Sequence, residues 1–268
     1  MPKFIKNQLW VLLLPLCLVA NAQFNISPRD MTATPVAYEP LRQADIAFQW
    51  TVERIIDTRE KQNVALNWPQ NPLRSIVYNA VLTGQVQAYR NNQFLEAIPD
   101  TEVVHIGDYC HLEEYPCGDD LFDICDTMIC DPLDLEKLTK WKVIEQWYFD
   151  SEQSRMIPRI IGLALMYRPI VGGLELPETP VFWVKYDDLR PALAQNQILN
   201  PHNEAASISY DHFFNARQFS SYIVKYPNVH DLPIGAMEEF ADNNTAALLQ
   251  AERMKQKLME TEHDLWEF

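Results

Sequence analysis

Apolar residues in the first third of the chain recur at the spacing of a helix. Phe48, Val52, Ile55 and Ile56 follow the i, i+4, i+7, i+8 positions of one apolar helix face. The pattern predicts a first amphipathic helix over about residues 43–62, with these four side chains turned toward the core.

Charged residues occupy the other positions of this predicted helix. Arg54 reaches Asp57 at i+3, and Asp57 reaches Lys61 at i+4 with the acid N-terminal to the base. We therefore expect Glu53, Arg54, Asp57 and Lys61 to face outward, where a protein partner can contact them. Charge reversal at Arg54 or Asp57 should then weaken assembly more than folding.

A second helix is predicted directly after Pro72. Its apolar face consists of Leu73, Ile76, Val77, Ala80 and Val81, and Thr83-Gly84 supplies its stop. After Gly84 the period becomes strand-like, with a turn at Asn91-Asn92 between two short strands.

The middle of the chain predicts a long β-hairpin from Trp141 to Tyr167. Large apolar residues alternate with polar ones up to Asp150, and the turn falls on residues 150–153. The return strand is apolar on both sides, as expected for a central strand. A further strand is predicted over Val181–Tyr186.

Helices are predicted in the last third of the chain. Asp187-Asp188 is placed as an N-cap before residues 189–199, and Asp211 heads a short helix. Residues 237–266 form a long Gly- and Pro-free helical pattern with a discontinuous apolar stripe that includes Leu248, Leu249 and Leu258. This irregular mixture predicts an α+β fold with a mixed, mainly antiparallel sheet and packed helices.

The domain organisation follows from the N-terminal region. Lys3 and Lys6, an apolar run over residues 9–20 and an Ala-Asn-Ala site predict a cleavable signal peptide over residues 1–22. Residues 23–42 contain three prolines and predict an extended N-terminal arm, either disordered or laid along a neighbour. The α+β core is expected over 43–235, with an acidic cysteine-rich insertion at 105–136, and the C-terminal helix over 236–268.

The charge balance narrows the class of partner. Without residues 1–22 the chain keeps 20 basic and 37 acidic residues, a formal charge of 20 − 37 = −17. This excludes nucleic acid, which needs a basic surface, and direct docking on an anionic membrane. It suits a basic protein or a divalent cation, or simply keeps the chain soluble.

Four cysteines form the clearest chemical constellation of the mature sequence. The even number of Cys110, Cys117, Cys125 and Cys130 in an exported chain predicts two disulfides whose connectivity stays open. A zinc site with His105 and His111 is an alternative, although no spacing is Cys-x-x-Cys. The surrounding aspartates also suggest calcium, without the loop motif of a calcium-binding hand.

No motif of catalysis is present. The sequence lacks a Gly-x-Ser-x-Gly elbow, a His-Glu-x-x-His pair, a phosphate loop and a dinucleotide fingerprint. Isolated histidines remain as candidates for a nucleophilic site with Ser207, Ser209 or Asp211, namely His202, His212, His230 and His263. We therefore expect no catalytic residues, no cofactor and no metal.

Four ordered blocks of the sequence resemble the GldN/PorN family. They are residues 50–63, 73–89, 143–167 and 181–222, with Gln-Trp-Tyr-Phe-Asp and Phe-Trp-Val-Lys-Tyr among them. The resemblance implies a non-catalytic periplasmic subunit of the type IX (Por) secretion and gliding-motility machinery. It further implies assembly with itself and with an outer-membrane lipoprotein into a ring, connected to an inner-membrane motor complex. The cysteine-rich insertion is not part of the resemblance.

Two other functions compete with this one. An exported binding protein would use the acidic, disulfide-bonded loop to hold calcium or a basic ligand. An exported hydrolase would use a site without a known motif.

Overall fold

The hairpin predicted between Trp141 and Tyr167 is the centre of the fold. The computed structural model describes residues 34–116, 124–171, 174–200 and 208–264. The hairpin consists of β5 (Lys140–Asp150) and β6 (Arg155–Tyr167), which pair antiparallel along almost their whole length. The predicted hairpin is therefore confirmed, with its turn over residues 151–154.

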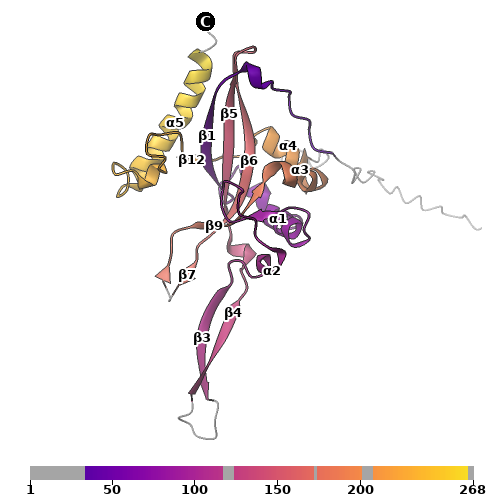
Figure 1. Ribbon diagram of the computed structural model, residues 1–268, viewed down its shortest axis with the longest axis vertical. Helices are drawn as coiled ribbons and strands as arrows, with labels where there is room; N and C mark the ends of the chain where they lie inside the picture. Colours follow the sequence, from indigo (N-terminus) through magenta and orange to yellow (C-terminus); the bar gives the residue numbers. More distant parts are fainter. Residues whose placement is uncertain (1–33, 117–123, 172–173, 201–207, 265–268) are drawn as a thin grey trace, which may run out of the picture. The chain divides into compact units, whose positions relative to one another are not determined.

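Four more strands extend the hairpin into a six-stranded sheet. The strand order is β12-β1-β5-β6-β9-β2, and all neighbours are antiparallel. Figure 1 shows the three long strands β1, β5 and β6 side by side. The added strands are β1 (Ile46–Asp57), β2 (Ala88–Tyr89), β9 (Thr179–Lys185) and β12 (Tyr222–Lys225). The predicted α+β class with a mainly antiparallel sheet is confirmed.

Helices and small hairpins complete the described chain. The helices are α1 (Leu73–Leu82), α2 (Asp100–Val103), α3 (Tyr186–Gln195), α4 (Tyr210–Asn215) and α5 (Asn244–Asp264). The paired short strands are β3 (Tyr109–Pro116) with β4 (Ile124–Asp131), β7 (Ile170–Val171) with β8 (Leu174–Glu175), and β10 (Gln197–Ile198) with β11 (Ile208–Ser209). Short 3₁₀ helices are η1 (Gln43–Asp45), η2 (Val64–Asn67), η3 (Leu135–Lys137) and η4 (Ile234–Ala236).

The predicted helix over residues 43–62 is wrong, because most of this stretch is strand β1. Phe48, Val52 and Ile56 are four residues apart, and an even spacing also places side chains on one face of a strand. The apolar partners that decide between the two lie far away in sequence: Phe48 faces Phe149 and Ile56 faces Trp141 across β5. Tertiary pairing therefore overrides the local helical period.

The second predicted helix is confirmed as α1. All five of its predicted apolar residues are buried in the main core, listed as Leu73, Ile76, Val77, Ala80 and Val81. Gly84 has a φ of 69° and donates its N–H to the carbonyl of Val81, 3.0 Å away. This left-handed residue ends the helix as the sequence predicts. The main core joins α1, α3 and α4 to one face of the sheet.

The strand predicted over Val181–Tyr186 is confirmed as β9, but the caps of the two following helices differ from the prediction. Lys185 precedes α3, so Asp187 lies inside its first turn, where a carboxylate favours the helix dipole. Ser209 caps α4, and Asp211 lies within that helix and is buried.

The C-terminal helix begins later than predicted, at Asn244. The side-chain carbonyl of Asn243 accepts a hydrogen bond from the amide of Ala246 at 3.0 Å, which fixes the start of α5. Ala251 and Leu258 are buried against β1, β12 and η4, whereas the predicted stripe residues Leu248 and Leu249 are more than half exposed. The predicted stripe is thus confirmed at Leu258 and wrong at Leu248 and Leu249.

The N-terminal arm is only partly described. The predicted signal peptide over residues 1–22 and the first part of the arm, residues 23–33, lie outside the described residues. Residues 34–42 form no helix or strand and lead into η1. Among the helices described, none has the length and apolar character needed to cross a membrane.

Candidate interaction surfaces

Arg54, predicted to face a partner, is instead buried on the apolar face of the sheet. It is 4% exposed, and its Nε donates to Oε2 of Glu145 on β5 at 2.9 Å. The same oxygen accepts from Nε1 of Trp147 at 3.0 Å, and Arg217 Nη2 lies 2.8 Å from the other carboxylate oxygen. Burial lowers the pKa of Arg54, an effect that the nearby carboxylate opposes. Charge reversal at Arg54 should therefore unfold the chain.

Glu53 is also buried, on the opposite face of β1. The residue is 5% exposed, and its carboxylate forms an ion pair with Lys142 Nζ at 2.7 Å and accepts from Asn92 Nδ2 at 3.1 Å. Lys142 in turn lies 5.9 Å from the centre of the Trp183 ring. The expectation that Glu53 faces outward is wrong because both faces of this strand are covered here.

Asp57 and Lys61 remain near the surface, but not as the predicted pair. Asp57 binds Arg59 at 2.5 Å, and this hydrogen bond holds the pKa of Asp57 below its usual value. Lys61 follows the end of β1 and is exposed. Of the four predicted interface residues, Lys61 is the exposed one, whereas the Asp57 side chain is 13% exposed and is covered by Arg59.

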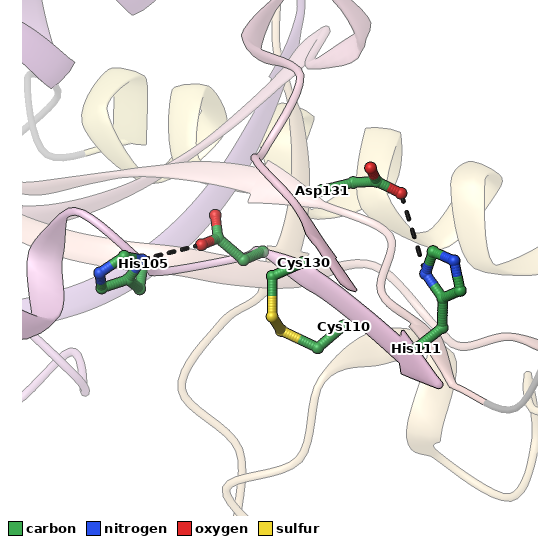
Figure 2. Close-up of a disulfide and its surroundings, with 6 residues drawn as sticks. His105, Cys110, His111, Cys130 and Asp131 are labelled. Carbon is green, nitrogen blue, oxygen red and sulfur yellow. Dashed lines mark hydrogen bonds and ion pairs between the residues drawn. A yellow bond between two sulfur atoms is a disulfide. The ribbon is translucent and has the colours of Figure 1, made fainter. Parts of the chain in front are cut away.

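The cysteine-rich insertion is a β-hairpin built from β3 and β4. Cys110 and Cys130 face each other across it and form a disulfide with a Cα separation of 4.0 Å (Figure 2). Cys125 is disulfide-bonded as well, whereas Cys117 lies outside the described residues. The prediction of disulfide chemistry in this insertion is confirmed for the described cysteines.

The zinc and calcium alternatives find no support in the described part of the hairpin. His105 lies 3.1 Å from an oxygen of Asp108, and His111 lies 3.9 Å from one of Asp131, so each imidazole turns to its own carboxylate (Figure 2). No cluster of three or more potential ligands exists among the residues that the structure describes.

An exposed apolar pair marks one face of this hairpin. Leu112 and Met128 face each other across the two strands and are 65% and 67% exposed. The next pair on the same face is acidic, Glu114 opposite Asp126. Sequence reasoning found the acidic character but missed this apolar pair, which the alternation of the two strands reveals.

The candidates for a hydrolytic site have structural partners. The Ser209 side chain accepts from the backbone amide of His212 at 3.2 Å, and Asp211 binds Arg190 at 2.8 Å. His230 and His263 are exposed. His202 and Ser207 lie outside the described residues.

A polar cavity of about 750 Å³ lies along α1, near the end of α3. Amide side chains are prominent in its lining, including Gln70, Asn79, Gln85 and Gln195. The charged groups among its described lining residues are Arg74 and Glu136, and it contains no histidine or cysteine.

Comparison with known families gives one match. The model of the family described as "Gliding motility associated protein GldN" matches residues 41–267, which include every described helix and strand. No curated protein matches the chain. The match confirms the resemblance of the four sequence blocks, and it covers most of the 268 residues. The chain therefore belongs to the GldN family of gliding-motility-associated proteins.

Proposed function

We propose that this chain is a non-enzymatic structural subunit of the type IX secretion and gliding-motility apparatus. It is exported to the periplasm and assembles there with further copies of itself and with an outer-membrane-anchored lipoprotein into a ring. The observation that carries the proposal is the family match over residues 41–267.

The described surface supports a role through protein contacts. The hairpin β3–β4 exposes Leu112 and Met128 beside acidic residues, and α5 exposes Leu248 and Leu249. Contiguous exposed apolar side chains rimmed by charge are typical of protein interaction sites. Lys61, just after the end of β1, adds an exposed charge.

Purification from the cell envelope tests the proposal. The tagged chain should elute in a large complex that contains an outer-membrane lipoprotein. Lys61→Glu should reduce the yield of this complex without changing thermal stability, because Lys61 is exposed. Lys137→Glu is the matched control, since its side chain is 83% exposed on η3, and it should leave the complex intact. A monomer recovered from the soluble periplasm would contradict the proposal.

A further inference from the structure

One edge of the six-stranded sheet is open over much of its length. The edge strand β12 pairs only with Glu53, Arg54 and Ile55 of β1, whereas β5 pairs with β1 from its first residue to its last. Among the described residues, none pairs through its backbone with the outer side of residues 46–52. Alternate residues of an antiparallel strand direct their N–H and C=O groups to opposite sides. The outward groups of this stretch are therefore a template for a further strand.

The open edge lacks the features that keep edge strands from pairing. Natural edge strands carry lysines, prolines or bulges for this purpose. Residues 48–52, with the sequence Phe-Gln-Trp-Thr-Val, contain no charge and no proline, and aromatic and β-branched residues favour strands. Pairing is regular over this stretch, since the irregularities of β1 lie before Phe48 and at Glu53. The sequence of this edge therefore suits pairing with another strand.

The residues after β12 explain why this strand does not continue along β1. Pro227 has no N–H group to donate, so the ladder ends before it. The side chain of Asn228 then closes the following loop. Its Nδ2 donates to the carbonyls of Tyr226 and Leu232, both at 2.8 Å, and its Oδ1 accepts from the amide of Leu232 at 3.1 Å. The end of β12 is thus fixed by its own sequence.

Hollows flank the open edge on both faces of the sheet. On the side where α5 lies (Figure 1), a cavity of about 200 Å³ has Trp50, Met254 and Leu258 in its lining. A cavity of about 340 Å³ on the other face has Thr51 and Asp231 in its lining. The first is smaller than the roughly 300–1,000 Å³ of a small-molecule pocket, which suits a single side chain. Successive residues of an added strand point to opposite faces, so neighbouring side chains reach the two hollows.

The charges around the hollows set the chemistry of the added strand. On the Thr51 side, Asp231 is 84% exposed, whereas its partner Lys225 is 22% exposed and Glu53 is buried. The accessible charge on this face is negative, and it attracts a cationic side chain. Lys257 lines the apolar hollow, where it disfavours a second cation. The matching segment therefore alternates basic and apolar residues.

The charges also decide whose segment fits. The chain's own arm is held elsewhere, since the amide of Val36 donates to Oδ2 of Asp211 at 2.7 Å and Glu39 pairs with Arg155 on β6. In a second copy, the corresponding edge of β1 has no basic residue over 46–52, and two chains with a formal charge of −15 repel each other. Charge complementarity therefore favours a basic segment of a different protein.

We propose that the outer edge of β1 over residues 46–52 binds an extended basic segment of a partner protein as an additional strand. The backbone of this segment pairs with β1. One of its apolar side chains enters the hollow beside Trp50 and Met254, and a neighbouring lysine or arginine reaches Asp231. The contact goes beyond the proposed function, because it requires neither a ring nor an envelope anchor.

Binding of a synthetic peptide to the purified chain tests the strand addition. The probe is a labelled peptide, as long as the open edge, that alternates phenylalanine and lysine, and its affinity is measured by fluorescence anisotropy. Two controls carry the same charge: a peptide with all lysines in one block, and the alternating peptide with N-methylated backbone amides. The alternating peptide should bind at least about tenfold more tightly than either control, because it alone supplies both the backbone donors and the two-faced pattern. Equal affinities would overturn the proposal.

Hydrogen exchange and a variant pair locate the bound peptide. The peptide should slow amide exchange at alternate residues of the stretch 46–52 and leave exchange in β9 unchanged. Thr51→Lys adds a charge to the open edge and should lower the affinity by about tenfold. Thr179→Lys is the matched control, since Thr179 is an exposed threonine of β9, and its effect should stay below about twofold. The N-methylated peptide leaves the chain unaltered, so its result decides the question if a variant is unstable.

The remaining outcomes separate this inference from its alternatives. Unchanged exchange in residues 46–52 on addition of the alternating peptide would overturn it. Exchange that slows there with rising protein concentration, without peptide, would identify a second copy as the occupant and also overturn it. Peptide binding at this edge without an envelope complex would support this inference while the proposed function fails, and an envelope complex without peptide binding would do the reverse.

Discussion

Replacing Glu145 by alanine removes the carboxylate that three donors share. Arg54, Trp147 and Arg217 all bind it, and its side chain has no exposed surface. The variant leaves Arg54 buried without a counter-charge, and Arg217 keeps only partial access to water. The loss therefore exceeds that of an ordinary hydrogen bond.

The magnitude follows from the burial of the ions. Removing one partner of a buried ion pair costs about 3–5 kcal/mol, because the remaining charge stays desolvated. A domain of this size loses roughly 2–4 °C in melting temperature for each kcal/mol. Glu145→Ala should therefore lower the melting temperature by about 6–20 °C.

Urea unfolding followed by tryptophan fluorescence measures the loss in free energy of unfolding, since Trp147 contacts the site. A thermal scan measures the change in melting temperature. Glu102→Ala is the matched control, because Glu102 pairs with Arg90 at the surface, and it should cost less than about 1 kcal/mol. Arg54→Met combined with Glu145→Leu replaces the pair by apolar side chains and should recover at least half of the loss. A cost below about 1 kcal/mol for Glu145→Ala, or no recovery in the double variant, would refute this reasoning.

Three further predictions concern the loop over the sheet, the arm and the hairpin. Gly162→Ala places a Cβ 2.4 Å from Cζ of Phe94 and should lower the free energy of unfolding in urea by about 1–3 kcal/mol. In the control Gly235→Ala the new Cβ meets no atom within 4 Å, so the free energy of unfolding should change by less than about 0.5 kcal/mol. Equal effects of the two variants would contradict the packing argument. The pKa of Glu39 is lowered by its hydrogen bond from an arginine, so the arm contact is present above the ordinary value of 4.5 and is lost as the pH falls through the lowered value. A spin label on the arm should gain mobility in that range, and Glu39→Gln should give mobility that does not change with pH. Replacing both Cys110 and Cys130 by serine should speed amide exchange in the β3–β4 hairpin on the order of a hundredfold, since the disulfide spans 20 residues. The unfolding midpoint of the core should not change. A shifted midpoint would mean that the hairpin stabilises the core.

Local patterns predicted those elements whose stability depends on neighbours in sequence. Residues 73–82 have a helical face and a glycine stop, and residues 140–167 have alternating residues around a turn, so both are visible without tertiary information. Strand β1 was not predictable from its local sequence, because the even spacing of Phe48, Val52 and Ile56 fits both a helix and a strand. The choice is made by β5, about 90 residues later in the chain.

The candidate interaction residues likewise differ in how far their local sequence predicts them. The disulfide chemistry of the cysteines was predictable from their even number and from the predicted signal peptide. The burial of Arg54 was not, because its counter-ion Glu145 is 91 residues away and looks like any other strand residue in sequence. The pairing of Arg190 with Asp211 and the binding of the arm likewise depend on how α3 and α4 meet.

The buried ion pair of Arg54 and Glu145 also divides one face of the sheet into two apolar clusters. Among the described residues, the main core contains 28 buried members, whereas the cluster under α5 contains five, with Val52 and Leu258 among them. A region with so few buried contacts opens at a lower free energy than the rest of the fold. We therefore expect the C-terminal helix to open as a separate cooperative unit, exposing its apolar face while the main core stays folded.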